Sequence, residues 1–200
     1  MYRTVVIDPP WLERGAGRIR RGADRHYALM TERQIVRMLG SSIAPLLARD
    51  CHAWIWTTNT FLGAGLRVLR KFGFRYVTNL CWVKDRIGLG QYLRGRHELC
   101  LFGVRGTTML VAHDVPSVVF CKRAEHSQKP QAAYDAIARV SPSPRLDVFA
   151  RDRHPGFDAW GNEVRVGLFD LEPVGGSPNL LRIPSASEWE PLIVECRGDL

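Results

Sequence analysis

The sequence predicts an α/β fold, in which a mainly parallel sheet carries helices on both faces. Short β-branched or aromatic runs, typical of buried strands, alternate along the chain with longer stretches of helical periodicity. The chain of 200 residues is 46% hydrophobic and long enough to bury a full core. We therefore expect one domain over residues 1–170, followed by a tail of uncertain structure at residues 171–200.

The predicted strands are apolar runs that end at turn residues or charges. The first is a run of four β-branched residues, and the prolyl pair Pro9-Pro10 that follows Asp8 cannot continue a strand ladder. By the same pattern, strands are expected at residues 4–7, 53–57, 76–83, 98–104 and 146–149.

Three helices are predicted between these strands. Thr31 has the features of a helix cap, because Gln34 completes a capping box before an apolar stripe. A second, amphipathic helix begins at Asn59 or Thr60. The third begins at Pro130, since proline is tolerated in the first turn of a helix.

Charge and cysteine content narrow the class of protein. The net charge of +8 suits a polyanionic partner such as nucleic acid, because phosphate contacts supply most non-specific affinity; the plainer interpretation is that the charge only aids solubility. No apolar run reaches the length of a membrane span, and the N-terminus lacks a signal pattern, so no membrane partner is expected. Five widely spread cysteines without a Cys-x-x-Cys pair indicate a reducing cytoplasm and no structural zinc.

The turn Asp8-Pro9-Pro10-Trp11 lies at the carboxyl end of the first strand, which is where α/β sheets bind ligands. An adenine amine, for example, is a poor nucleophile because its lone pair is delocalised into the ring. Asp8 and the Pro9 carbonyl are acceptors that would localise this lone pair by binding the two amine hydrogens, and Trp11 would stack on the base. Taken alone, the prolyl pair is simply a turn.

Residues 84–98 combine basic side chains with glycines and one tyrosine, Tyr92. Such a loop suits a phosphate backbone, with Tyr92 free to stack; the alternative is a solvated charged hairpin. His97-Glu98 resembles part of a zinc motif, but no second histidine follows at helical spacing, so no metal is expected. Glu98 is instead expected to orient the loop or to hydrogen-bond a substrate.

Two later clusters carry candidate ligand contacts. Lys129 precedes the third helix, where a point charge and free backbone amides suit a carboxylate or phosphate; otherwise it is a surface lysine. Arg151 follows the last core strand, and Asn162 and Glu163 are the donor and acceptor types that sugar hydroxyls need.

Together these clusters resemble the MT-A70-like N6-adenine methyltransferases, in particular the bacterial and phage members that act on DNA. The matching segments occur in order across residues 2–165: Asp8-Pro9-Pro10-Trp11, His26-Tyr27, Trp56-Thr57-Thr58-Asn59, Trp82-Val83-Lys84, Gly88 to Glu98, His126-Ser127-x-Lys129-Pro130, Phe149-Ala150-Arg151 and Trp160-Gly161-Asn162-Glu163. The family's Gly-Trp-Asp-x-Trp appears here as Gly156-Phe157-Asp158-Ala159-Trp160, a mild aromatic exchange.

The resemblance implies a Rossmann-like sheet that binds S-adenosylmethionine, in a permuted (beta-class) order with the catalytic motif early and much of the cofactor site late. It implies that the catalytic residues are Asp8, Pro9, Pro10 and Trp11, with Trp11 shaping the base pocket. The residues that it implies for the cofactor are Asp8, Lys129, Arg151, Asn162 and Glu163.

The resemblance covers no large target-recognition domain. Specificity for the nucleic-acid sequence is therefore expected from residues 12–28 and 84–98, or from a partner. Such a partner would make the protein a homo- or hetero-oligomer. The candidate nucleic-acid contacts are Arg18, Arg20, Arg21, His26, Tyr27, Lys84, Tyr92, Arg94, Arg96 and Glu98.

The expected reaction is methyl transfer from S-adenosylmethionine to the N6 amine of adenine in DNA. One alternative is the same reaction on RNA, which net charge cannot separate because both polymers present phosphates. Another is a catalytically silent, nucleic-acid-binding partner of a second methyltransferase, although the intact Asp8 motif weighs against it. A dinucleotide oxidoreductase is excluded, because no strand is followed by the glycine fingerprint.

Overall fold

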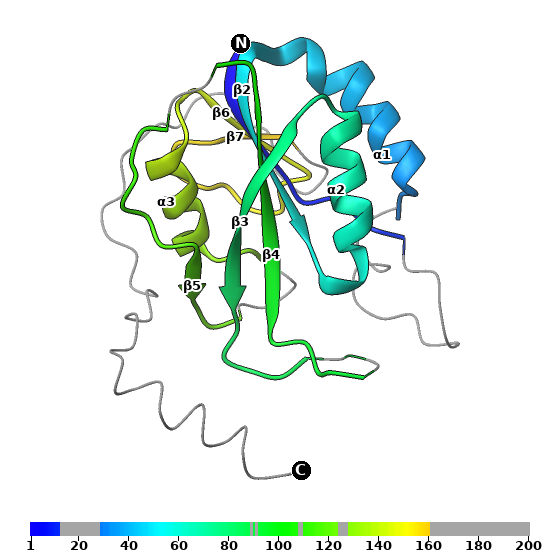
Figure 1. Ribbon diagram of the computed structural model, residues 1–200, viewed down its shortest axis with the longest axis vertical. Coiled ribbons are helices and arrows are strands. Elements are labelled where there is room, and N and C mark those ends of the chain that lie inside the picture. Colours follow the sequence, from blue (N-terminus) through cyan, green and yellow to red (C-terminus); the bar gives the residue numbers. More distant parts are fainter. Residues whose placement is uncertain (13–28, 89, 91, 108–109, 124–127, 161–200) are drawn as a thin grey trace.

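The computed structural model describes residues 1–12, 29–88, 90, 92–107, 110–123 and 128–160. Their core is one seven-stranded sheet with the order β5-β3-β4-β2-β1-β6-β7 (Figure 1). The strands are β1 (Tyr2–Ile7), β2 (Leu47–Thr57), β3 (Arg75–Val83), β4 (His97–Arg105), β5 (Val118–Phe120), β6 (Arg145–Val148) and β7 (Asp158–Trp160). Both pairings of β4 are antiparallel and the other four are parallel, which confirms a mainly parallel sheet.

Helices cover both faces of this sheet, as predicted (Figure 1). They are α1 (Glu32–Met38), α2 (Leu62–Lys71) and α3 (Gln131–Val140). Successive β1 side chains alternate between the faces. Val5 and Ile7 belong to the apolar cluster formed with α1 and α2, whereas Val6 belongs to the cluster formed with α3.

The helix boundaries follow the local sequence signals. The predicted capping box is confirmed, because Thr31 Oγ1 accepts from the Gln34 backbone N–H and Gln34 Oε1 accepts from the Thr31 backbone N–H. A π-helical turn (Leu39–Ile43) and a 3-10 turn (Ala44–Leu46) connect α1 to β2. A further 3-10 turn (Asn59–Phe61) occupies the predicted start of α2.

Three features differ from the prediction. Strand β2 begins at Leu47 rather than residue 53, because its first half carries charges that interrupt the apolar run yet still pairs with neighbouring strands. Strands β5 and β7 were not predicted, since three residues are too few to show a period. Pro130 caps α3 from outside, one position before the predicted first turn.

The register of β1 brings sequence-distant segments together. Ile7 pairs with Ile55 of β2 on one side and with Val148 of β6 on the other. The Asp8 backbone N–H then donates to the Val148 carbonyl at 3.2 Å. The turn after β1 is therefore fixed beside the segment that follows β6. The predicted tail and most of residues 12–28 lie outside the described residues.

A cluster of polar side chains is buried in the core around His52. His52 is fully buried, and its Nδ1 lies 2.9 Å from Ser141 Oγ. The same hydroxyl oxygen accepts from Trp54 Nε1 at 2.9 Å. Burial lowers the pKa of His52 to about 4, so its imidazole is neutral at pH 7.

We expect His52 to lower the free energy of unfolding as pH is reduced from 7 to 5. The unfolded His52 takes up a proton near pH 6.5, whereas the folded form excludes it down to about pH 4. Stability is thus present above pH 6.5 and lost as pH falls toward 4. In a His52→Gln variant, the difference in unfolding free energy between pH 7 and pH 5 should be smaller by about 2 kcal/mol. Urea unfolding of both proteins at both pH values measures this, and an unchanged pH dependence in the variant would contradict it.

Candidate active site

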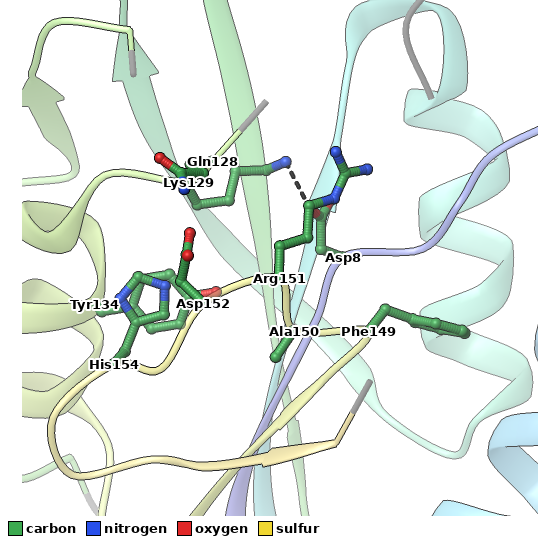
Figure 2. Close-up of a pocket in the computed structure, with 9 residues that line it drawn as sticks. All are labelled: Asp8, Gln128, Lys129, Tyr134, Phe149, Ala150, Arg151, Asp152 and His154. Carbon is green, nitrogen blue, oxygen red and sulfur yellow. Dashed lines mark hydrogen bonds and ion pairs between the residues drawn. The ribbon is translucent and has the colours of Figure 1, made fainter. Parts of the chain in front are cut away.

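A pocket lies at the carboxyl ends of β1 and β6, the sheet edge where ligands of α/β proteins bind (Figure 2). It is lined by Asp8, Gln128, Lys129, Tyr134, Phe149, Ala150, Arg151, Asp152 and His154. Three residues predicted from separate motifs, Asp8, Lys129 and Arg151, therefore share one pocket. In Figure 2 the side chains of Lys129 and Arg151 extend toward Asp8.

A chain of alternating charges, here called the charge chain, extends from the pocket and consists of Asp8, Lys129, Glu98 and Lys84. Lys129 Nζ lies 2.8 Å from Asp8 Oδ2 and 3.5 Å from Glu98 Oε2. Glu98 Oε1 in turn accepts from Lys84 Nζ. The Lys129 side chain is only 8% exposed, which rules out a surface lysine. Glu98 pairs with both Lys84 and Lys129, and its expected role of orienting the loop or binding a substrate stays a prediction.

Mutual pairing keeps the inner members of the charge chain ionised. Burial alone would lower the pKa of Lys129, but Asp8 and Glu98 outweigh it and raise that pKa. Burial alone would raise the pKa of Glu98, but Lys129 and Lys84 outweigh it and lower that pKa. The Trp56 ring also lies 5.5 Å from Lys129 Nζ, a cation–π distance.

The turn after β1 is pinned at several points. The Pro9 carbonyl accepts from the Trp11 backbone N–H at 2.8 Å, and the Pro10 carbonyl accepts from the Met30 backbone N–H at 2.8 Å. The Trp11 ring stacks on Phe61, with centroids 5.5 Å apart, and its Nε1 donates to the Trp56 carbonyl. A rigid turn of this kind holds its acceptors in place before any ligand arrives.

Two acceptors of this turn keep capacity for a ligand. A carbonyl oxygen has two lone pairs, and the Pro9 oxygen uses one for Trp11. On Asp8, Lys129 occupies Oδ2, while Oδ1 accepts no hydrogen bond from the described residues. Each of these two oxygens can therefore accept one further hydrogen bond, and their joint binding of one amine stays a prediction.

The segment after β6 adopts a strained conformation that the sequence did not reveal. Phe149 has φ of 65°, in the left-handed region that favours glycine. The backbone N–H groups of Phe149 and Ala150 both donate to the Trp160 carbonyl, at 2.7 and 3.2 Å, which holds this turn. The turn directs the chain from β6 into the wall of the pocket, and such strain often marks a functional site.

Sequence reasoning also missed an aromatic and carboxyl cluster beside the pocket. The Tyr134 ring stacks on His154 at 3.4 Å between centroids, and its hydroxyl donates to Asp147 Oδ2 at 2.9 Å. Burial raises the pKa of Asp147 to about 8, so this carboxyl is largely protonated at neutral pH, and burial lowers the pKa of His154 to about 4. Tyr134 fits the apolar stripe of α3, so its spacing gives no functional signal.

The remaining predicted residues are divided between the arm after β3 and the part of the chain outside the described residues. Tyr92, Arg94 and Arg96 are exposed and do not line the pocket. The candidates outside the described residues are Arg18, Arg20, Arg21, His26, Tyr27, Asn162 and Glu163. Within the described ranges, no group of metal-ligating side chains could hold an ion, and no helix is long and apolar enough to cross a membrane.

The family model described as MT-A70 matches residues 2–163. The chain is 26% identical over 192 residues to Type II methyltransferase M.MunI of Mycoplasma sp, covering 87% of this chain and 82% of that protein. It is 26% identical over 174 residues to a rice protein named Probable N(6)-adenosine-methyltransferase MT-A70-like, covering 82% of this chain and 23% of that protein. It is 27% identical over 188 residues to human N(6)-adenosine-methyltransferase catalytic subunit METTL3, covering 86% of this chain and 30% of that protein.

We expect Lys129→Met to destabilise the fold by about 2–3 kcal/mol. The change leaves the carboxylates of Asp8 and Glu98 without the ammonium group between them, and partial exposure of both moderates the cost. Chemical unfolding measures the loss. Adding Asp8→Asn to Lys129→Met should recover part of it, because one buried charge is then removed. Additive losses in the double variant would contradict the pairing.

Proposed function

We propose that this chain, which belongs to the MT-A70 family, transfers a methyl group from S-adenosylmethionine to the N6 amine of adenine in DNA. The observation that carries the proposal is the convergence of Asp8, Lys129 and Arg151 on one pocket beside the pinned Asp8–Trp11 turn. DNA is favoured over RNA by the resemblance of the motifs to bacterial and phage DNA enzymes. The match to 82% of M.MunI, against 30% of human METTL3, supports the same choice.

The charges of the pocket fit the amino-acid part of S-adenosylmethionine. That part carries one carboxylate and one ammonium group, and the pocket supplies the cations Lys129 and Arg151 together with the anions Asp8 and Asp152. Asn162 and Glu163 are the proposed ribose contacts. When bound, the cofactor supplies an electrophilic methyl group on a sulfonium centre.

A permuted motif order follows from the same proposal. The catalytic turn comes directly after β1, whereas the proposed cofactor residues come before α3 and after β6, late in the chain. Parallel pairing of β1 with β6 makes these early and late segments neighbours at one edge of the sheet. The adjacency of these early and late segments supports the proposed permuted order.

The chain acts mainly by holding the adenine amine. Asp8 Oδ1 and the Pro9 carbonyl each accept one amine hydrogen, which localises the lone pair on nitrogen. Lys129 fixes the carboxylate through Oδ2, so that the amine is aimed at the methyl group. Orientation of this kind contributes up to about 7–11 kcal/mol in favourable cases. The methylated amine is then a strong acid and releases its extra proton to water, so no strong general base is required.

Asp8→Ala should lower methyl transfer by roughly 100-fold or more, because it removes an acceptor aimed at the reacting amine. Cofactor binding should be retained in part, since Lys129 and Arg151 remain. The measurement is transfer of labelled methyl to duplex DNA, single-stranded DNA and RNA. Asp114→Asn is a matched control, because Asp114 is 73% exposed and paired with Arg139 outside the pocket.

The results of this assay separate the alternatives. Label on DNA that Asp8→Ala abolishes supports the proposed reaction, and undiminished turnover in that variant contradicts the role of Asp8. Label on RNA alone would show that RNA is the substrate and would leave the proposed mechanism unchanged. Absence of cofactor binding favours the silent partner instead, whereas cofactor binding without label on any polymer indicates a missing partner subunit or an untested recognition sequence.

A further inference from the structure

An arm of residues 84–96 joins β3 to β4 and projects beyond the edge of the sheet (Figure 1). Its two sides remain hydrogen-bonded past the ends of the strands. The Lys84 backbone N–H donates to the Arg96 carbonyl at 2.8 Å, and the Gly88 N–H donates to the Gly95 carbonyl at 2.6 Å. Arg94 Nε also donates to the Gly88 carbonyl. The described part of the arm is therefore an ordered extension of the β3–β4 hairpin.

Two glycines allow the close approach of the two sides. A Cβ on Gly90 would lie 1.9 Å from the Leu93 carbonyl oxygen, and a Cβ on Gly88 would lie 2.9 Å from the Gly95 carbonyl oxygen. Both contacts are with backbone, which cannot move aside as a side chain can. Gly88 and Gly90 are therefore suited to the close approach of the described parts of the two sides.

The tip presents apolar side chains to solvent. Tyr92 is 97% exposed and Leu93 is 87% exposed, the two most exposed large apolar side chains among the described residues, and Ile87 is 63% exposed. Exposed apolar groups on a projecting arm indicate a contact with a partner. Arg86, Arg94 and Arg96 are exposed along the same arm. Cations beside an apolar tip match the chemistry of a DNA duplex, which has phosphates outside and stacked bases inside.

The base of the arm is coupled to the pocket. Lys84 begins the arm and Glu98 lies just beyond its end, and both are members of the charge chain that ends at Asp8. The arm and the pocket therefore occupy the same edge of the sheet and are joined through partly buried ion pairs. A nucleic acid held on the arm would lie beside the pocket.

We propose that Tyr92 and Leu93 enter a DNA duplex and fill the space that the target adenine leaves when it rotates into the pocket. The proposal rests on the proposed function and makes a double-stranded substrate the preferred one. Extruding a base loses its stacking and pairing, and an inserted aromatic and aliphatic pair restores stacking with the bases on either side. The arginines of the arm bind the phosphates that flank the opened step.

The test compares a Tyr92→Ala/Leu93→Ala variant with the unaltered protein on three substrates. They are a matched duplex carrying the sequence that the protein is found to methylate, the same duplex with the target adenine mispaired, and the single strand. On the matched duplex kcat/KM should fall at least tenfold. On the mispaired duplex and single strand it should fall less than threefold, because the target base is already unpaired.

A Tyr76→Ala/Val77→Ala variant is the matched control. These residues are 41% and 45% exposed at the start of β3, away from the arm, and their loss should leave all three rates unchanged. Fluorescence of 2-aminopurine at the target position gives a second readout. It should rise when the unaltered protein binds the duplex and rise less with the arm variant.

The outcomes separate this proposal from the proposed function. Equal losses on matched and mispaired duplexes, or no loss on either, overturn the insertion of Tyr92 and Leu93 and leave DNA methylation intact. If the preceding assay finds no DNA sequence that the unaltered protein methylates, the proposed function is overturned and this inference with it.

Discussion

The rest of the site depends on the pairing of one buried ammonium group, that of Lys129, with the carboxylates of Asp8 and Glu98. A buried charge is tolerated only when it is compensated, so this lysine brings three chain segments to fixed positions. They are the turn after β1, the residues before α3 and the first residues of β4. The same pairing leaves Asp8 one oxygen for a ligand and ties the arm after β3 to the pocket.

The position of β1 within the sheet makes this pairing possible. Because β1 lies between β2 and β6, its carboxyl end is surrounded by segments far away in the sequence. The left-handed turn at Phe149 then directs the chain toward the pocket. The backbone N–H groups of Phe149 and Ala150 donate to the Trp160 carbonyl, so β7 stabilises this turn. Local strain at Phe149 is thus compensated by the pairing of β6 with β7.

Much of the fold could be predicted, because the strands β1, β3, β4 and β6 are apolar runs of clear period and the Thr31 cap is a local signal. Asp8, Lys129 and Arg151 could be selected from motifs, but their contacts could not, since those depend on long-range register. The stacking of Tyr134 on His154 and the raised pKa of Asp147 follow from burial, which has no local sequence pattern. The conformation of Phe149 was missed because glycine is the usual signal for a left-handed residue.

The most direct test of the central claim is the position of the transferred methyl group. DNA incubated with the protein and S-adenosylmethionine carrying a deuterated methyl would be digested to nucleosides and analysed by mass spectrometry. The account predicts deuterated N6-methyladenine as the product, since the Asp8–Pro9 acceptors are placed to bind an exocyclic amine. Label on a ring nitrogen or carbon, or on another base, would contradict it.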